Sequence, residues 1–367
     1  ISKHARDLIS EKGDGTPIEW VHRNQRFGEK LATPDTSIAD LIGEVDPIKV
    51  AEGRYLSDEL TLHYGLVPRT NRGIFAINEL PDLSERIQVG LLNILEERDV
   101  QIRGYKVRLP LDVILVASAN PEDYTNRGRI ITPLKDRFGS QIRTHYPFDI
   151  ELERQIAVQE ANMFPHESVH VDIPDFMEKI IATLSHIARE NPNINQRSGV
   201  SVRLTVSNYE TLIAGSLRRA LLNEETYAVP RVSDLSSLVA STSGKIEIET
   251  LEDGRETEII RHLIKQSVLE VFRETVDHSL CSPLLDEFEN GAVVSAGDDI
   301  SSTSYIDYLN KMEPFKPILE NIGLSAADLD NPAHVASGIE FILEGLHLSK
   351  MLNKDAVGDA GIYRAST

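Results

Sequence analysis

The sequence predicts an α/β fold with a parallel sheet, followed by a largely helical region. Two short apolar runs, Ile74 to Ile77 and Val113 to Ala117, are too short for helices, and polar residues follow each of them. A stretch with the apolar spacing of an amphipathic helix lies between them. Both runs are therefore expected to form buried strands, and a glycine precedes the first of them.

Length and composition limit the possible classes of protein. At 367 residues the chain is predicted to hold two or three domains, since one domain usually has about 100 to 200 residues. No signal peptide opens the chain, and no apolar run approaches the roughly 20 residues of a membrane span. The single cysteine, Cys281, excludes an internal disulfide framework, fits a cytoplasmic protein and is expected to be a small buried hydrophobe. The first residue is Ile rather than Met, which predicts that the chain begins inside a longer gene product.

The formal net charge of −20 is unevenly distributed. Residues 251–367 contain 21 acidic and 9 basic residues, a formal charge of −12. Such a surface repels phosphate backbones, so nonspecific nucleic-acid binding by the whole chain is disfavoured. The acidic pairs Asp298-Asp299 and Glu96-Glu97 are interpreted as solvated faces.

Short elements are predicted before the first apolar run. We expect a helix over residues 2–12 and a short strand over residues 18–22. Residues 35–37 are expected to cap a short helix that Gly43 ends. Residues 46–70 alternate irregularly and are predicted to be an inserted excursion.

Asn78 and Glu79 directly follow the first apolar run and are the centre of the functional prediction. In an open parallel sheet, ligands bind at the carboxyl ends of the strands. An acidic pair at this position is the Walker B arrangement of nucleotide-hydrolysing proteins. The alternative is a strand that runs into a turn, because Asn and Pro are common turn residues.

Helical and hairpin patterns make up most of the remaining chain. Asp82 and Glu85 have the spacing of a capping box, and the second apolar run leads to a polar residue, Asn120. Up to residue 150, the pattern predicts a helix over 83–95, a hairpin of segments 100–103 and 106–109, and a short helix over 133–139. Beyond residue 150, helices are predicted over 151–161, 176–190, 202–222, 256–276 and 339–352, with a loop-rich acidic stretch over 284–303.

This order of elements, with Asn-Glu after one strand, Asn after the next and then Leu-Lys-Asp-Arg-Phe at 134–138, resembles the magnesium chelatase ATPase subunit and its relatives, the MoxR-like AAA+ proteins. Residues 30–47 and 69–73 resemble the same family. The resemblance extends from about residue 30 to 215 and is absent beyond about 245. It implies a partial AAA+ α/β core over 1–150 with a helix-2 insert and a hairpin before sensor 1, a helical lid with sensor 2 over 151–245, and an acidic helical C-terminal region over 246–367.

The resemblance also implies roles for single residues. Glu79 takes the place of the catalytic glutamate that polarises the water attacking the γ-phosphate. Asn120 matches sensor 1, and Arg137 matches the arginine finger that reaches the nucleotide of a neighbouring subunit. Arg203 matches sensor 2, which would contact the nucleotide from the lid. Its alternative is a solvated arginine in the first turn of a helix.

Asn78 departs from the family pattern. It stands where the family has the aspartate that helps to hold the water shell of Mg²⁺. An amide can accept a hydrogen bond from a metal-bound water, but it contributes no Coulombic attraction to the cation. Asn78 therefore puts the affinity for Mg²⁺ and the rate of ATP turnover in question.

The resemblance implies a ring-forming ATPase that uses ATP and Mg²⁺ to remodel or load a partner protein. A homo-oligomeric ring, of hexameric size, is expected, and the partner in such systems often has a von Willebrand A domain. The family's phosphate-binding motif, Gly-x-x-x-x-Gly-Lys-Ser/Thr, does not occur in the 367 residues. The chain as given is therefore expected to bind ATP poorly, and we expect the first strand and the phosphate loop to lie upstream or, alternatively, the chain to be a degenerate relative.

Two functions of other classes remain open. The first is a scaffold that keeps the AAA+ shape without hydrolysis, which Asn78 suggests. The second is a protein that acts on DNA, because Arg103, Lys106 and Arg108 make the predicted hairpin basic. A sigma-54 activator is a weaker variant of this second function, since the sequence lacks Gly-Ala-Phe-Thr-Gly-Ala.

Residues 166–170 match the metalloprotease pattern His-Glu-x-x-His. That chemistry requires both histidines one turn apart on a helix. Pro165 precedes the motif and a strand-like alternation follows it, so a helix is disfavoured and we interpret the match as chance.

Overall fold

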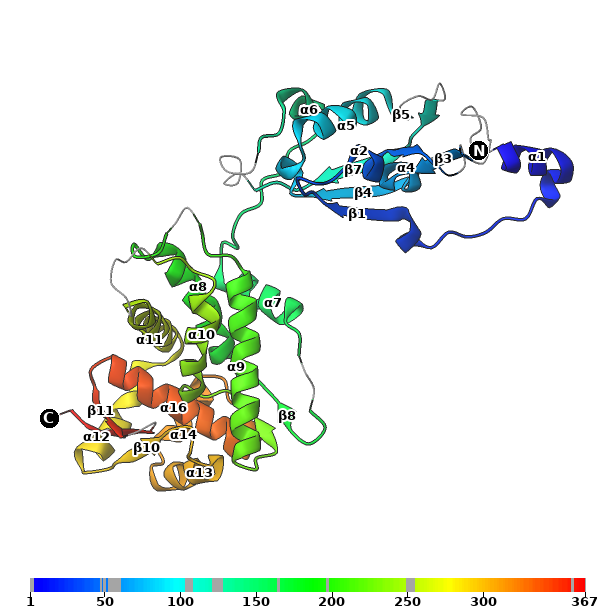
Figure 1. Ribbon diagram of the computed structural model, residues 1–367. Helices are drawn as coiled ribbons and strands as arrows, with labels where there is room; N and C mark the ends of the chain where they lie inside the picture. The colour runs from blue at the N-terminus through cyan, green and yellow to red at the C-terminus, as the bar shows by residue number, and fades with distance from the viewer. Residues whose placement is uncertain are drawn as a thin grey trace. The chain divides into compact units, whose positions relative to one another are not determined.

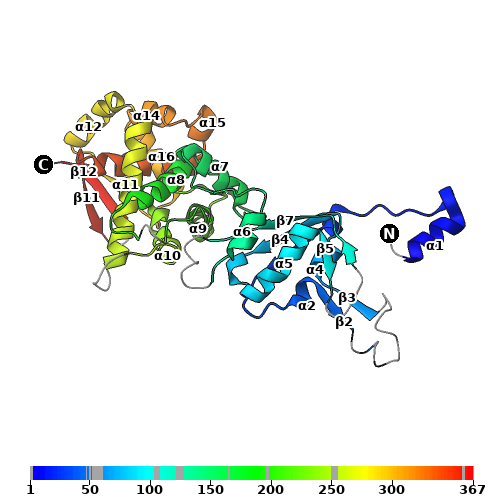
Figure 2. The same cartoon turned by 90° about the horizontal axis from the view of Figure 1, so that it is seen from above.

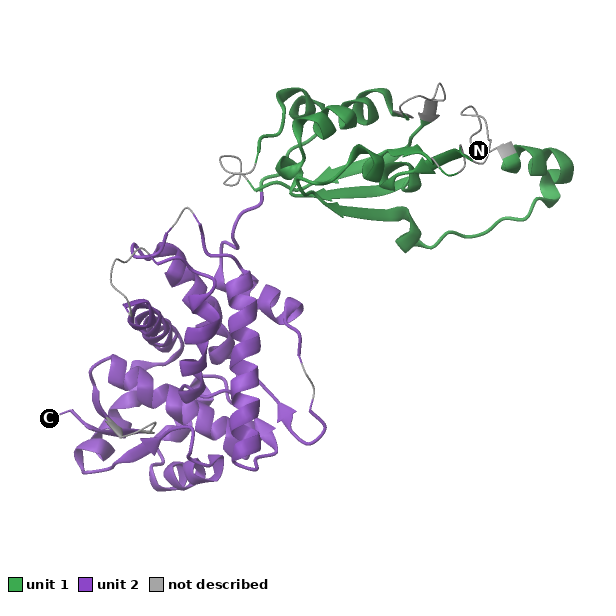
Figure 3. Ribbon diagram, in the orientation of Figure 1, with its two compact units in different colours: residues 1–143 green, residues 144–367 purple. Residues whose placement is uncertain are grey.

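The computed structural model describes residues 3–46, 48, 51, 61–102, 108–120, 128–163, 166–195, 198–248, 255–357 and 360–366. The chain folds as two compact units, residues 1–143 and 144–367 (Figure 3). Each unit has its own hydrophobic core. The finer division at residues 150 and 245 stays a prediction.

A parallel three-stranded sheet forms the centre of the first unit (Figure 1). Its strands are β1 (Phe27–Leu31), β4 (Gly73–Asn78) and β7 (Val113–Ala117), in the spatial order β1-β4-β7. Leu31 is paired with Asn78, and Ile77 is paired with Ala117. The three strands therefore end at the same edge of the sheet.

Helices cover one face of this sheet. The core there contains Phe75 and Ile77 of β4, together with Leu91 of the long helix α5 (Glu85–Glu97). Three short helices add to the same core: α2 (Ile38–Leu41), α4 (Leu66–Arg69) and α6 (Thr132–Arg137). Figure 2 shows α5 crossing above β4. The apolar stripe of α5 explains why the sequence from 85 to 97 is helical here.

The other face of the sheet is open, which corrects the prediction that both apolar runs are buried. Exposure alternates along β7, where Ile114 is 64% and Val116 is 51% exposed. On the same face Phe27, Leu31 and Ile74 are also exposed. Continuous apolar runs predict cover on both faces, but among the described residues only one face is covered.

Of the short elements predicted before the first apolar run, the helix cap is confirmed and the strand is not. The predicted cap is confirmed, because Ser37 and Asp40 form a reciprocal capping box at α2. Gly43 follows α2 and has a φ of 121°, which favours glycine. A Cβ atom added at this position would lie 2.2 Å from the His63 carbonyl oxygen, so a side chain is excluded. The strand expected over 18–22 is wrong, since that segment is irregular and pairs with no strand among the described residues.

The second helix start was also mispredicted. Asp82 and Glu85 have capping-box spacing, but Asp82 ends a 3-10 turn, η4 (Leu80–Asp82). Helix α5 begins after Ser84, whose side chain makes no capping hydrogen bond. Pro81 in η4 favours this separate turn, because its fixed φ suits the first turn of a helix.

Small elements surround the sheet. They comprise α1 (Lys3–Lys12), η1 (Gly13–Gly15), η2 (Arg23–Arg26), the antiparallel pair β2 (Gly43–Val45) and β3 (Leu62–Tyr64), and the hairpin β5 (Asp99–Gln101) and β6 (Arg108–Pro110). The helix at the start and the hairpin are thus confirmed. Strand β2 ends just before the excursion predicted over 46–70, and β3 lies within it. Residues 47, 49, 50 and 52–60 of the excursion lie outside the described residues, as do Arg103 and Lys106 of the basic hairpin.

The second unit begins as a bundle of helices, as the periodicity predicts. Its first helices are α7 (Ile150–Glu160), α8 (Asp175–Glu190), α9 (Arg203–Leu222), α10 (Leu238–Ser243) and α11 (Arg255–Thr275). A short parallel pair, β8 (His170–Val171) and β9 (Tyr227–Ala228), joins two of its connections. Glu153 is fully buried between α7 and α8, where both of its oxygens accept hydrogen bonds from Arg189, at 2.6 and 2.7 Å.

The C-terminal part is helical as predicted, and it also contains a small antiparallel sheet. It contains η6 (Ser233–Ser237), η7 (His278–Cys281), α12 (Ser282–Glu289), α13 (Ser302–Lys311), α14 (Phe315–Asn321), α15 (Ala326–Leu329) and α16 (Pro332–Leu348), and the antiparallel strands β10 (Val294–Ala296), β12 (Ala360–Ala365) and β11 (Leu352–Val357). The stretch 284–303 therefore includes a helix and a strand, and the last predicted helix ends at Leu348.

Cys281 is buried as predicted, and this burial raises the pKa of its thiol. None of the described helices is long and apolar enough to cross a bilayer.

The contrast between the two faces of the sheet can be tested by truncating one residue on each face. Phe75→Ala removes a fully buried ring and should lower the free energy of unfolding by about 3 to 5 kcal/mol. Ile114→Ala, on the open face, should cost about 1 kcal/mol or less. Urea unfolding of the two variants measures both values, and equal losses would show that the open face is covered in solution.

Candidate functional site

The carboxyl ends of β4 and β7 bring polar groups together. Asn78 is the last residue of β4, and Ser118 follows β7 directly. The Ser118 hydroxyl donates a hydrogen bond to Asn78 Oδ1 at 3.2 Å. The Ser118 hydroxyl oxygen also accepts a hydrogen bond from the backbone N–H of Glu79, at 3.2 Å. Ser118 therefore connects the two residues that the sequence singled out.

Glu29 of β1 completes this group. Asn78 Nδ2 donates to Glu29 Oε1 at 2.5 Å. The parallel register explains the contact: Leu31 pairs with Asn78, and Glu29 lies two residues earlier, so both side chains lie on the open face. The cluster of Glu29, Asn78, Glu79 and Ser118 is called the strand-end site below.

Glu79 has an unusual backbone conformation. Its φ of 56° and ψ of 50° lie in the left-handed region, which is uncommon for a residue with a side chain. Its carbonyl oxygen accepts the N–H of Asp82 at 2.9 Å, which fixes the following 3-10 turn. The half-buried carboxylate has no hydrogen-bond partner among the described residues. Such strain is often retained where a residue has to be aimed at a ligand.

Asn120 and Arg137 have different surroundings. Asn120 is exposed, two residues beyond Ser118. Arg137, on α6, forms an ion pair with Glu96 of α5, with Nη2 and Oε2 2.8 Å apart. Their side chains are 31% and 53% exposed, and exposed pairs of this kind contribute little stability. The Arg137 guanidinium also donates to the Pro133 carbonyl oxygen at 3.2 Å, so it is held within its own chain by exposed contacts.

Arg203 lies in the second unit, at the first position of α9. It is exposed and lines an open groove of about 870 Å³, together with His145, Glu160, Glu210 and Lys245. These residues mix both signs of charge. The strand-end site belongs to the first unit and is described without Arg203, whose assignment to a nucleotide stays a prediction.

Sequence reasoning missed two members of the strand-end site. Ser118 had a usable signal, because it is the first polar residue after the second apolar run. Glu29 had none, since its contact with Asn78 spans 49 residues and depends on which strand lies next to β4.

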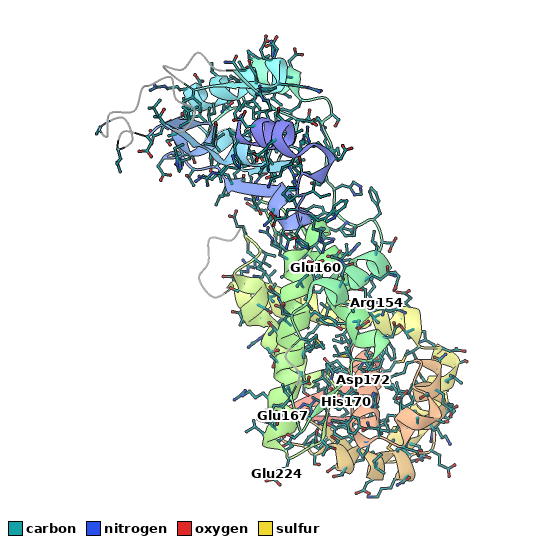
Figure 4. The ribbon with its side chains drawn as sticks, turned by 90° about the vertical axis from the view of Figure 1, so that its right-hand side faces the viewer. Arg154, Glu160, Glu167, His170, Asp172 and Glu224 are labelled. Carbon is teal, nitrogen blue, oxygen red and sulfur yellow. The ribbon has the colours of Figure 1, made fainter. Side chains whose placement is uncertain are left out.

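The His-Glu-x-x-His motif is not helical. Ser168 donates its backbone N–H to His166 Nδ1 at 3.3 Å, which forms a turn, and His170 belongs to strand β8. Figure 4 labels Glu167 and His170 in this segment. The predicted absence of a helix is confirmed, so the two histidines lack the one-turn helical spacing that this zinc motif needs.

A second polar cluster joins distant parts of the second unit. It contains Asp172, Asp328 and His334. One carboxylate oxygen of each aspartate and one ring nitrogen of the histidine lie within 4.8 Å of one another. His334 Nε2 lies 2.8 Å from Asp172 Oδ2, and His334 Nδ1 is buried without a partner among the described residues. Metal-bound histidines usually donate their second ring N–H to an acceptor. We therefore interpret the cluster as a hydrogen-bonded contact between Asp172, which follows β8, and α16.

Oxygen atoms dominate the strand-end site. Carboxylates, amide carbonyls and hydroxyls are the ligands that Mg²⁺ prefers, directly or through its bound waters. The Glu29 carboxylate beside the Asn78 amide, the Ser118 hydroxyl and the side chain of Glu79 supply oxygen atoms of this kind. These residues could hold a hydrated divalent cation and polarise a water molecule.

Comparison with known proteins gives partial matches. The family model of the Sigma-54 interaction domain matches residues 51–137, less than half of the chain. The magnesium-chelatase 38 kDa subunit of Cereibacter sphaeroides is 28% identical over 173 residues, which are 44% of this chain and 46% of that subunit. Magnesium-chelatase subunit ChlI of Porphyra purpurea is 34% identical over 104 residues, 28% of each chain. This chain thus spans less than half of either curated relative.

Among solved structures, the complex between subunits BchI and BchD of magnesium chelatase is similar over 64% of this chain and 72% of that one. The identity is 21% and the TM-score 0.30. The family match over residues 51–137 and the α/β architecture support an AAA+ fold for this chain. The order of its motifs and the partial matches to magnesium-chelatase subunits support similarity to the magnesium chelatase and MoxR-like type.

The role of Ser118 in holding the strand ends can be measured by stability. Ser118→Ala removes the donor to Asn78 and the acceptor for Glu79 N–H, so the free energy of unfolding should fall by about 0.5 to 1.5 kcal/mol. Ser84→Ala is the matched control, because Ser84 makes no capping hydrogen bond, and it should change the value by about 0.5 kcal/mol or less. Equal effects in urea unfolding would contradict the connecting role of Ser118.

Proposed function

We propose that this chain is the motor part of an ATP hydrolase that couples hydrolysis to remodelling or loading of a partner protein. Glu79 is the general base that polarises the attacking water. Asn120 senses the γ-phosphate, and Arg137 supplies positive charge to the nucleotide of a neighbouring subunit. ATP with Mg²⁺ is the substrate, and Arg203 contacts the nucleotide from the helical unit.

The observation that carries this proposal is the unpartnered side chain of Glu79 at the end of β4. Its carboxylate is half-buried at the ligand-binding edge of a parallel sheet and has no hydrogen-bond partner among the described residues. The left-handed backbone and the hydrogen bond from its N–H to Ser118 hold it there. A carboxylate in this condition is available to accept a proton from water.

Arg137 supports assembly into a ring. Its guanidinium forms one exposed pair with Glu96, and such a pair can be exchanged for a stronger interaction with a phosphate. An arginine that acts on the neighbouring subunit requires a head-to-tail arrangement, which forms a ring when the rotation between subunits closes. We propose a homo-oligomeric ring of hexameric size, with a partner that has a von Willebrand A domain, in keeping with the magnesium chelatase type.

A scaffold without hydrolysis is the second candidate, and Asn78 is the observation that favours it. A neutral amide contributes no charge toward a cation. The two functions differ in the behaviour of Glu79, since a scaffold has no use for a general base. A role on DNA has less support, because the net charge is −20 and the centre of the basic hairpin lies outside the described residues.

Glu79→Gln tests the hydrolase directly in the protein expressed from its full gene. The amide keeps the size of the side chain but cannot take a proton, so kcat for ATP should fall about 10² to 10⁴-fold while nucleotide affinity stays within about twofold. Phosphate release and fluorescent-nucleotide titration measure the two quantities. A wild type that binds ATP but releases no phosphate in its assembled state would favour the scaffold instead.

Arg137→Ala tests the action on a neighbouring subunit. Loss of the guanidinium should lower kcat by about 10³-fold, as for other arginine fingers. Glu96→Gln is the matched control, because it breaks the same ion pair and leaves the arginine in place, so it should retain hydrolysis. If the two variants lose activity equally, Arg137 acts only through its pair with Glu96. Mixing Arg137→Ala with Glu79→Gln subunits should restore part of the activity, since some interfaces then hold both intact groups.

A further inference from the structure

The orientation of the Asn78 amide is determined by its neighbours. A carboxylate only accepts hydrogen bonds, so the amide NH₂ has to face Glu29, at 2.5 Å. Asn78 Oδ1 then faces Ser118, whose hydroxyl donates to it at 3.2 Å. Both ends of the amide are thus engaged within the chain. Asn78 is held as a connector between strands β1 and β7.

Glu29 brings an uncompensated negative charge to this position. Its Oε1 accepts from Asn78, and its Oε2 has no hydrogen-bond partner in the described part of the chain. No lysine or arginine forms an ion pair with it among the described residues. The side chain is exposed on the open face of the sheet, next to the carboxyl end of β4. A carboxylate in this setting attracts a divalent cation.

We propose that Glu29 supplies, from the neighbouring strand, the negative charge that Asn78 lacks toward Mg²⁺. This inference rests on the proposed ATP hydrolase, and it assigns Glu29 as a residue that holds the water shell of the cation. Asn78 then positions the Glu29 carboxylate through its NH₂ group. Glu29 and Asn78 together then attract the cation and hold its water shell, which a single carboxylate at the end of β4 would otherwise do.

Charge and hydrogen bonding at Glu29 can be separated by substitution. Glu29→Gln keeps an oxygen that accepts from Asn78 and the length of the side chain, but it removes the charge. If the contact only satisfies the Asn78 amide, this change has little effect on metal binding. If the charge attracts the cation, metal affinity falls. Asn78→Asp in the Glu29→Gln background moves the charge from β1 to β4 and is the decisive rescue variant.

The experiment uses the full-length protein and Mn²⁺ as a paramagnetic substitute for Mg²⁺. Titration of Mn²⁺ in the presence of ADP, followed by electron paramagnetic resonance, gives the metal affinity, and ADP binding in EDTA gives metal-free nucleotide affinity. We expect Glu29→Gln to weaken Mn²⁺ binding about tenfold or more, with ADP binding in EDTA unchanged. Glu29→Gln/Asn78→Asp should recover Mn²⁺ affinity to within about threefold of the wild type. Glu44→Gln, an exposed change of the same kind on β2, should leave both values unchanged.

Three results would overturn the inference. Wild-type Mn²⁺ affinity in Glu29→Gln, with normal ADP binding, would refute the role of Glu29 and leave the hydrolase intact. A charge-shifted double variant that binds Mn²⁺ no better than Glu29→Gln would refute the exchange of roles between the two strands. Absence of ADP binding in every variant and in the wild type would refute the hydrolase itself, and this inference with it.

Discussion

The parallel pairing of β1, β4 and β7 is the constraint on which the candidate site depends. Parallel strands end at the same edge, so residues far apart in the chain meet there. Leu31 opposite Asn78 fixes how far Glu29 lies from the end of β4. A slip of one residue would move the Glu29 side chain to the helix-covered face. The register therefore determines which carboxylate Asn78 contacts.

Carboxylates in this chain differ in whether they have structural partners. In the second unit Glu153 is fully buried and bound by Arg189, and burial raises the pKa of Glu340, which accepts a hydrogen bond from Tyr305 at 2.6 Å. These groups have structural partners. At the strand-end site, Glu79 has none among the described residues and Glu29 has one amide. A carboxylate without structural partners at a ligand-binding edge is free to interact with a ligand, a cation or water.

The open face of the sheet carries exposed apolar residues next to the strand-end site. Ile114 and Val116 are more than half exposed, although their residue types favour burial. Phe75, on the opposite side, is completely buried beneath the helices. Asn78 and Glu29 lie on the open side, so this face carries both the apolar strand residues and the amide–carboxylate pair. Whatever covers those residues would also lie against that pair.

The sequence by itself determined the apolar runs, the polar residues that follow them and most helices, because these are set by local spacing along the chain. It placed Asn78 and Glu79 at a strand end and the capping box at Ser37, where the signal lies within a few residues. It mispredicted the cap at Asp82 and the burial of Val113 to Ala117, since propensity does not show what covers a strand. Only the tertiary structure decided that Glu29 and Ser118 join Asn78, because pairing between strands brings together residues that are 40 or more positions apart.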